Sequence, residues 1–197
     1  MNPNGGGNVK GSQAPMGVAV AGLALVGLMM VWWTAPLFAL LGESRYALEA
    51  ALHGVSAGLF MVTATIGLFQ AYRLLTGTIQ HSAQLEFGSV VNAFLAFLTI
   101  LFGNRIYIFY RAQGGPRTYF LENAPEVHKI FFEFKEFVAL FTLPLAVAAA
   151  FLFLVYRDQL LGSKSLRTIA AVLLALTFFY FLVAFGLGAA ITKLKAL

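Results

Sequence analysis

Hydrophobic residues fill five long stretches of the chain, and polar or charged residues gather in the short segments between them. A helix needs about 20 apolar residues to cross the hydrocarbon core of a bilayer, and each stretch is long enough to do so. The pattern therefore predicts an all-α integral membrane protein, a five-transmembrane-helix bundle. The expected spans are residues 16–41, 48–75, 87–110, 128–156 and 169–192.

Residues 1–15 have a different composition, because they are polar and rich in glycine, with Lys10 as their one charged side chain. Such a segment buries too little apolar area to order itself. We expect a mobile N-terminal tail over residues 1–15, followed by a single five-helix transmembrane domain over residues 16–197. The run 16–41 is too long for the apolar core of a cleavable signal peptide.

The composition of the 197 residues agrees with a membrane protein, since 60% are hydrophobic and only 11% are charged. A soluble domain is usually about one quarter charged, which excludes a soluble enzyme. The chain has no cysteine, which excludes disulfides, thiolate-bound zinc, cysteine-ligated iron–sulfur clusters and covalently attached haem. The sequence shows neither a phosphate-binding glycine loop nor a nucleophile elbow, so catalysis by this chain alone is not expected.

The net charge of +5 comes from basic residues at the ends of the apolar runs rather than in one patch. This distribution is typical of membrane spans and does not favour a nucleic-acid partner. We call the membrane side that carries residues 1–15 side A, and the side where spans 48–75 and 128–156 begin side B. Lys and Arg are slightly more numerous on side B, which the positive-inside rule assigns to the cytoplasm. The expected location is the inner (plasma) membrane of a bacterium.

Polar side chains concentrate in the side B half of the predicted bundle, at similar depth in three spans. His53 lies about one turn inside the second span, Arg105 lies near the end of the third, and His128 begins the fourth. Lys135 follows seven residues after His128, so that the two are expected on one helical face. Ionisable groups inside a span are costly and mark candidate sites.

These positions suggest one b-type haem or other tetrapyrrole held by His53 and His128. Such a cofactor needs imidazoles at matched depth on facing helices, with small residues beside them. Ala50, Gly54 and Gly58 form a small-residue stripe on the helix that carries His53. In this hypothesis His53 and His128 ligate the iron, and Arg105 and Lys135 offset the charge of the propionates. His81 lies on side A and cannot join them.

Two alternatives use the same residues differently. In the first, His53 bonds a carbonyl or hydroxyl group inside the bundle and His128 is interfacial, and the chain is a cofactor-free accessory subunit that docks on partner membrane proteins. In the second, Glu133 and Glu136 serve a proton or cation transporter. Transport is disfavoured because the charges occupy one leaflet and do not cross the midplane. Every alternative expects a lipid bilayer and other membrane subunits as partners, in a hetero- or homo-oligomer.

In helix count, and in the placement of His53 and His128, the chain resembles the single-chain cytochrome b anchors of succinate dehydrogenases and fumarate reductases. The resemblance implies a five-helix subunit of a larger assembly, with haem bound by membrane histidines. Two-haem members of that family carry four histidines on four helices, whereas this chain offers two. The resemblance therefore implies one haem at most, and it assigns no quinone-site residue.

Overall fold

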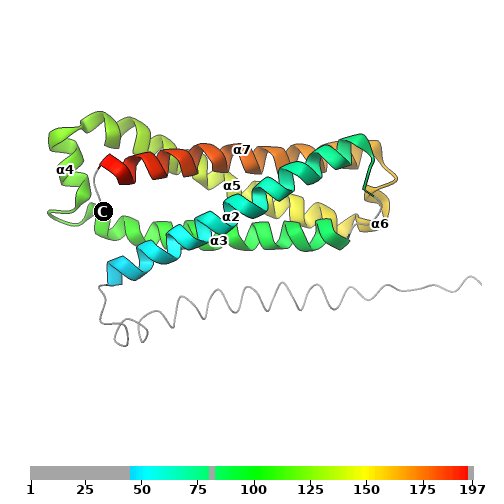
Figure 1. Ribbon diagram of the computed structural model, residues 1–197, viewed down its shortest axis with the longest axis horizontal. Helices are drawn as coiled ribbons and strands as arrows, with labels where there is room; N and C mark the ends of the chain where they lie inside the picture. Colours follow the sequence, from blue (N-terminus) through cyan, green and yellow to red (C-terminus); the bar gives the residue numbers. More distant parts are fainter. Residues whose placement is uncertain (1–44, 80–82, 195–197) are drawn as a thin grey trace, which may run out of the picture. The chain divides into compact units, whose positions relative to one another are not determined.

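The computed structural model of the protein describes residues 45–79 and 83–194 (Figure 1). The chain divides into two compact units, Met1–Thr34 and Ala35–Leu197, and every described residue belongs to the second. The predicted tail at 1–15 and the first predicted span at 16–41 lie outside the described residues. All elements within the described ranges are helical.

Four helices are long and apolar enough to cross a membrane, and they correspond to the second to fifth predicted spans. The first three elements are α2 (Arg45–Thr76), α3 (Ala83–Arg111) and the short α4 (Pro116–Asn123). The fourth predicted span consists of η1 (Val127–Phe132), a π-helix, followed directly by α5 (Glu133–Val155). The short α6 (Arg157–Leu160) and the long α7 (Lys164–Leu194) complete the order. These spans indicate a multi-pass membrane protein whose helices pack as a bundle.

The four long helices form a ring in which α2 packs on α3 and α7, and α5 packs on the same two helices. Near the middle of the ring the Phe60 and Phe181 rings lie 4.1 Å apart. Ala96 and Ala146 are buried in the same cluster, so that small residues from α3 and α5 accommodate the two rings. We call these four residues the phenylalanine layer. It is an apolar layer between the two ends of the bundle.

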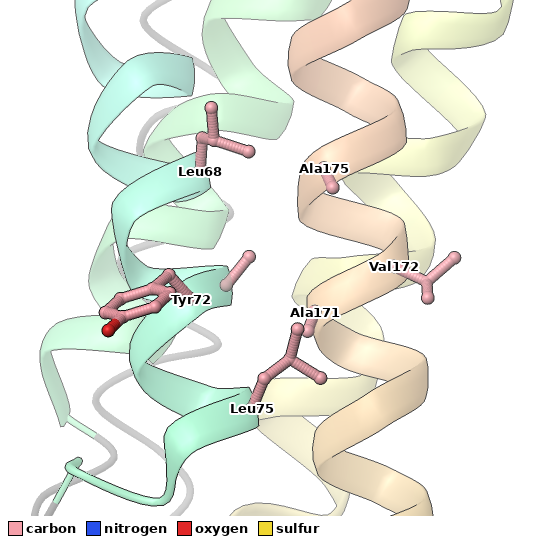
Figure 2. A pocket seen from close by; sticks show the side chains of 7 residues that line it. Leu68, Tyr72, Leu75, Ala171, Val172 and Ala175 are labelled. Atoms are coloured by element: carbon pink, nitrogen blue, oxygen red, sulfur yellow. The ribbon is translucent and has the colours of Figure 1, made fainter.

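The outer surface of the bundle is apolar, as a lipid environment requires. On α2 the exposed side chains Val55, Leu59, Val62, Ile66 and Phe69 recur every three or four residues, which places them on one helical face. A shallow apolar groove opens between α2 and α7 toward their side A ends (Figure 2). The groove is lined by Leu68, Ala71, Tyr72, Leu75, Ala171, Val172 and Ala175.

The connection between the third and fourth spans contains the short helix α4, which lies outside the five predicted spans. Gly114 adopts a φ of +73°, and a Cβ on Gly115 would lie 2.7 Å from the Phe109 carbonyl oxygen, so the turn requires glycine at both positions. Pro116 then occupies the first turn of α4, where its missing N–H costs nothing. In Figure 1, α4 lies at one end of the bundle and α6 at the other.

The fourth span begins as a π-helix, in which the Glu133 N–H donates to the carbonyl of His128, five residues earlier. A π-helical turn contains about one residue more than an α-helical turn. Side chains on one face of η1 are therefore not followed on the same face of α5 at the spacing that a continuous α-helix would give. This offset changes which neighbours the side chains of His128 and Lys135 meet.

Candidate functional site

The side B end of the bundle contains a buried ion pair between α2 and α3. The Glu49 side chain is 1% exposed, and its Oε1 atom accepts hydrogen bonds from Nε and Nη2 of Arg105, both at 2.7 Å. The pair joins residues 56 positions apart in the sequence. It fixes α2 against α3 at the level where His53 follows, one turn later on the same face of α2.

The His53 ring lies between α2 and α3 with a defined orientation. Its Nδ1 atom is 2.9 Å from the backbone carbonyl oxygen of Thr99. Since a carbonyl only accepts, Nδ1 carries the proton, and in the neutral ring Nε2 keeps its lone pair. A Cβ on Gly103 would lie 3.2 Å from Cε1 of His53, so the glycine admits the ring. The first alternative expected a carbonyl partner for His53, and Thr99 provides one.

Lys135 reaches into the same part of the bundle from α5. Its side chain crosses α7 at Gly188, where an added Cβ would lie 3.3 Å from Cε of the lysine. Its Nζ lies 5.3 Å from the centre of the Phe132 ring, and it is close enough to act electrostatically on His53. Within residues 45–79 and 83–194, Lys135 forms no ion pair with a carboxylate. The Glu136 carboxylate acts electrostatically on the same ammonium, so Lys135 has an anion nearby without a direct ion pair.

His128 occupies a different environment, buried to 2% exposure beneath α4. Nε of Arg117 donates to its Nε2 atom at 3.2 Å, and its Nδ1 atom is 2.9 Å from the Tyr110 hydroxyl. Because a guanidinium only donates, Nε2 is the acceptor and Nδ1 carries the proton. Both ring nitrogens are thus committed to protein partners. The ring also packs beside Phe132.

The two carboxylates proposed for transport, Glu133 and Glu136, lie in different surroundings. The Glu133 side chain is 57% exposed, and its nearer oxygen is 3.9 Å from Nε2 of His128. Glu136 is half-buried and within hydrogen-bonding reach of the Tyr107 hydroxyl. Neither forms an ion pair with Arg105, which bonds Glu49. No group of three or more metal-ligating side chains of the His, Cys, Asp or Glu type occurs among the described residues.

The structure thus separates the predicted site residues into two sets. His53 and Lys135 share the bundle interior, and His128 belongs to the cluster under α4 with Tyr110 and Arg117. Arg105 adjoins the first set, but its guanidinium bonds Glu49. The expectation that His128 and Lys135 share one helical face is wrong, because the π-helical turn between them changes the register.

The sequence places Glu49 one turn before His53 on the same face of its helix, but it does not predict the bond from Arg105 to Glu49. Nor does it predict Tyr110 and Arg117 as the partners of His128, or one buried acid. Glu86, 3% exposed on the side A end of α3, lies 3.9 Å from Arg157. Glu86 could have been found from spacing, since it begins a row of buried polar or small residues on α3. The row continues through Ser89, Asn92, Ala96 and Thr99.

Comparisons of the chain with family models, curated proteins and solved structures found no match. The arrangement of side chains at the side B end is therefore the basis for inferring function.

Proposed function

We propose that this chain is a small subunit of a membrane assembly and carries electrons through one b-type haem bound beside His53. In this proposal residues 16–41 supply a fifth span, and the protein lies in the inner membrane of a bacterium with other membrane subunits as partners. A haem supplies reversible one-electron transfer when bound. The chain supplies its ligand, its charge balance and its apolar surroundings.

The observation that carries the proposal is the bond from His53 to the Thr99 carbonyl. Histidines that ligate metals usually donate their second ring N–H to a carbonyl or carboxylate, which fixes both tautomer and ring orientation. The 2.9 Å contact from Nδ1 does this for His53 and leaves Nε2 as the ligating atom. Thr99 acts through its backbone, so side-chain substitution there preserves the bond.

Charge balance supports the same site. A propionate is an anion, and the described part of the bundle has two cations at this end, Arg105, which bonds Glu49, and Lys135. Lys135 forms no direct ion pair with a carboxylate among the described residues, although the half-buried Glu136 acts on it electrostatically. An anion placed near it would offset the cost of a charge inside the span. Arg105 would keep its bond to Glu49 and act as a positioning residue for α2.

Only one of the two histidines predicted to ligate the haem, His53, has the hydrogen bonding expected of a ligand. The donor chemistry of His53 matches a haem ligand, whereas both nitrogens of His128 are hydrogen-bonded to Tyr110 and Arg117. The proposal therefore rests on His53, with Lys135 as the propionate partner.

The test is a reduced-minus-oxidised absorption spectrum of the full chain purified with its membrane partners. The wild type is expected to show a Soret difference band, which His53→Ala removes. His81→Ala is the matched control, because the proposal gives no role to His81, a histidine between α2 and α3 in the sequence, and it is expected to keep the band. A colourless preparation of full-length wild type would reject the haem.

The accessory-subunit alternative is favoured by one observation, the exposed apolar row on α2. Of the four candidate spans, α2 has the smallest buried share in its most apolar window. A partner helix could cover this row without any cofactor. The same spectrum separates the two proposals, since a colourless protein that still copurifies with partner subunits supports the accessory role.

A transport role would need a polar route past the phenylalanine layer. Phe60, Ala96, Ala146 and Phe181 provide no ionisable group there. Glu133, moreover, faces outward rather than into the ring. Loss of proton flux in liposomes on substituting Glu136→Gln would favour transport over electron transfer.

A further inference from the structure

Two buried side chains, His128 and Tyr110, hold the Arg117 guanidinium at the side B end of the bundle. Nε of Arg117 donates to Nε2 of His128 at 3.2 Å, and the Tyr110 hydroxyl lies 2.9 Å from Nδ1 of the same ring. Both rings pack beside Phe132. Because packing and hydrogen bonding fix the acceptor, they also fix the direction of the guanidinium.

The terminal nitrogens of this guanidinium, Nη1 and Nη2, have no hydrogen-bond partner among the described residues. Arg117 is half-buried, and it forms no ion pair with a carboxylate within residues 45–79 and 83–194. The five N–H groups of a guanidinium form a planar fork that matches two oxygens of a phosphate. An oriented fork whose outer nitrogens lack a protein acceptor favours an anionic ligand.

Two further cations lie near the same histidine. Arg111 and Lys129 are close enough to act electrostatically on His128. The Arg111 guanidinium lies 4.5 Å from the centre of the Tyr107 ring, and Lys129 directly follows His128 in η1. Both side chains are exposed, and neither forms an ion pair with a carboxylate in the described ranges. Basic side chains from α3, α4 and η1 thus gather at this end of the bundle.

Carboxylates in this region lower the positive potential without pairing directly with these cations. The nearer oxygen of Glu133 is 3.9 Å from Nε2 of His128, and the Glu133 side chain is 57% exposed. Glu122 and Glu126 are exposed in the same connection and form no ion pair among the described residues. An anion can therefore still contact the cations directly.

The position of the cations suits a lipid headgroup. The helix η1 begins a candidate membrane span, and α4 lies at the end of the bundle (Figure 1). Phospholipid phosphates lie at the ends of membrane spans, and the acyl chains lie beside the apolar surface. Ile130 and Phe131, which follow Lys129, are 58% and 48% exposed. The basic residues assign side B to the cytoplasm, whose leaflet carries anionic lipids.

We propose that Arg117, Arg111 and Lys129 bind the phosphate of an anionic phospholipid in the side B leaflet. Arg117 donates from Nη1 and Nη2 to phosphate oxygens, and the other two cations add positive charge beside it. His128 is a positioning residue, because it accepts from Nε of Arg117 and so orients the fork. Ile130 contacts the acyl chains. Binding requires no haem, so this site is independent of the proposed electron transfer.

The experiment titrates the full chain, in an uncharged detergent, with dioleoyl phosphatidylglycerol and measures bound lipid by native mass spectrometry. Dioleoyl phosphatidylcholine has the same acyl chains without the net charge, and inorganic phosphate has the anion without the chains. Arg117→Gln is expected to bind phosphatidylglycerol about tenfold more weakly than the wild type, because charge-assisted hydrogen bonds are lost. Arg73→Gln is the matched control, since it removes the same charge at the other end of the bundle, and it should bind as the wild type does.

Two variants at His128 test its positioning role. His128→Gln keeps a donor and an acceptor and is expected to keep most of the affinity. His128→Leu removes the acceptor and should weaken binding about as much as Arg117→Gln does. The double variant should bind no more weakly than either single one, because both changes act on one contact. Additive losses in the double variant would overturn the positioning role.

A gain of binding provides a test that misfolding cannot imitate. Glu133→Gln removes an exposed negative charge near the site and leaves the contacts of Arg117 in place, so it should bind phosphatidylglycerol more tightly. Equal binding of the two lipids by the wild type, undiminished binding in Arg117→Gln, or no gain in Glu133→Gln would overturn the proposal. Displacement of the lipid by an equal concentration of inorganic phosphate would also overturn it, because the ligand would then be the free anion. A haem-free wild type that binds phosphatidylglycerol selectively would support this site and reject the haem.

Discussion

Arg105 donates two hydrogen bonds to one oxygen of Glu49, both at 2.7 Å, although 56 residues separate the two in the chain. The contact joins α2 to α3 where the bundle meets the side B interface. It also positions the segment of α2 that carries His53. Removing one partner of a buried ion pair leaves an uncompensated charge, which is more costly than removing both.

Arg105→Ala is expected to lower the free energy of unfolding in detergent by about 3–5 kcal/mol, because the buried Glu49 carboxylate would lose both of its hydrogen bonds from the guanidinium. The control is Arg157→Ala, whose guanidinium is 41% exposed and 3.9 Å from Glu86, and which should cost about 1 kcal/mol or less. Unfolding followed by circular dichroism gives both values. Equal losses in the two variants would contradict a buried pair at Glu49.

Gly103→Leu is expected to destabilise the protein by about 1–3 kcal/mol, as overpacking does in close-packed interiors. The added side chain would have to displace the His53 ring, because even a Cβ would lie 3.2 Å from it. Gly58→Leu is the matched control on α2, since a Cβ there meets nothing within 4 Å. Thermal unfolding of both variants measures the difference. If Gly58→Leu were the more harmful of the two, the packing of His53 on α3 would be incorrect.

Gly188→Leu is expected to push the Lys135 side chain out of its place against α7. A Cβ at Gly188 would lie 3.3 Å from Cε of Lys135, whereas one at Gly186 meets nothing within 4 Å. Labelling with an amine-reactive reagent, read by mass spectrometry of the peptide that contains Lys135, should become faster in Gly188→Leu and stay unchanged in Gly186→Leu. Unchanged labelling in both would place Lys135 outside the bundle interior.

Phe60→Ala is expected to cost about 3–5 kcal/mol, as large-to-small substitutions in a packed core do. Phe60 is 0% exposed and lies against Phe181, whereas its neighbour Leu59 is 52% exposed. Leu59→Ala is therefore the control, and it should change the free energy of unfolding little in detergent. A larger effect at Leu59 would mean that the face of α2 assigned to lipid is the one that packs.

Hydropathy predicted the second to fifth spans to within a few residues, because a bilayer requires every backbone polar group to be bonded within a helix or barrel. It also placed His53, Arg105, Lys135 and His128 toward the same end of the bundle. The depth of a side chain in the membrane follows from counting residues along its helix. The hydrogen-bond partner of a side chain does not, and so the bond between Glu49 and Arg105 could not be derived from local spacing.

Two features, one in the fourth span and one in the connection before it, could not be predicted in full from the sequence pattern. The π-helix at Val127–Phe132 changes the angular register, so that the spacing of seven between His128 and Lys135 no longer means a shared face. The helix α4 could have been predicted, because Pro116 after two glycines is a helix-start signal. Its contact with His128 through Arg117 depends on tertiary packing.

Native mass spectrometry of the full chain, released from detergent under gentle conditions, tests the central claim most directly. The account predicts a wild-type species heavier than the polypeptide by the mass of one haem, and a His53→Ala species at the polypeptide mass. Wild-type protein found at the polypeptide mass, or a haem retained in full by His53→Ala, would contradict it.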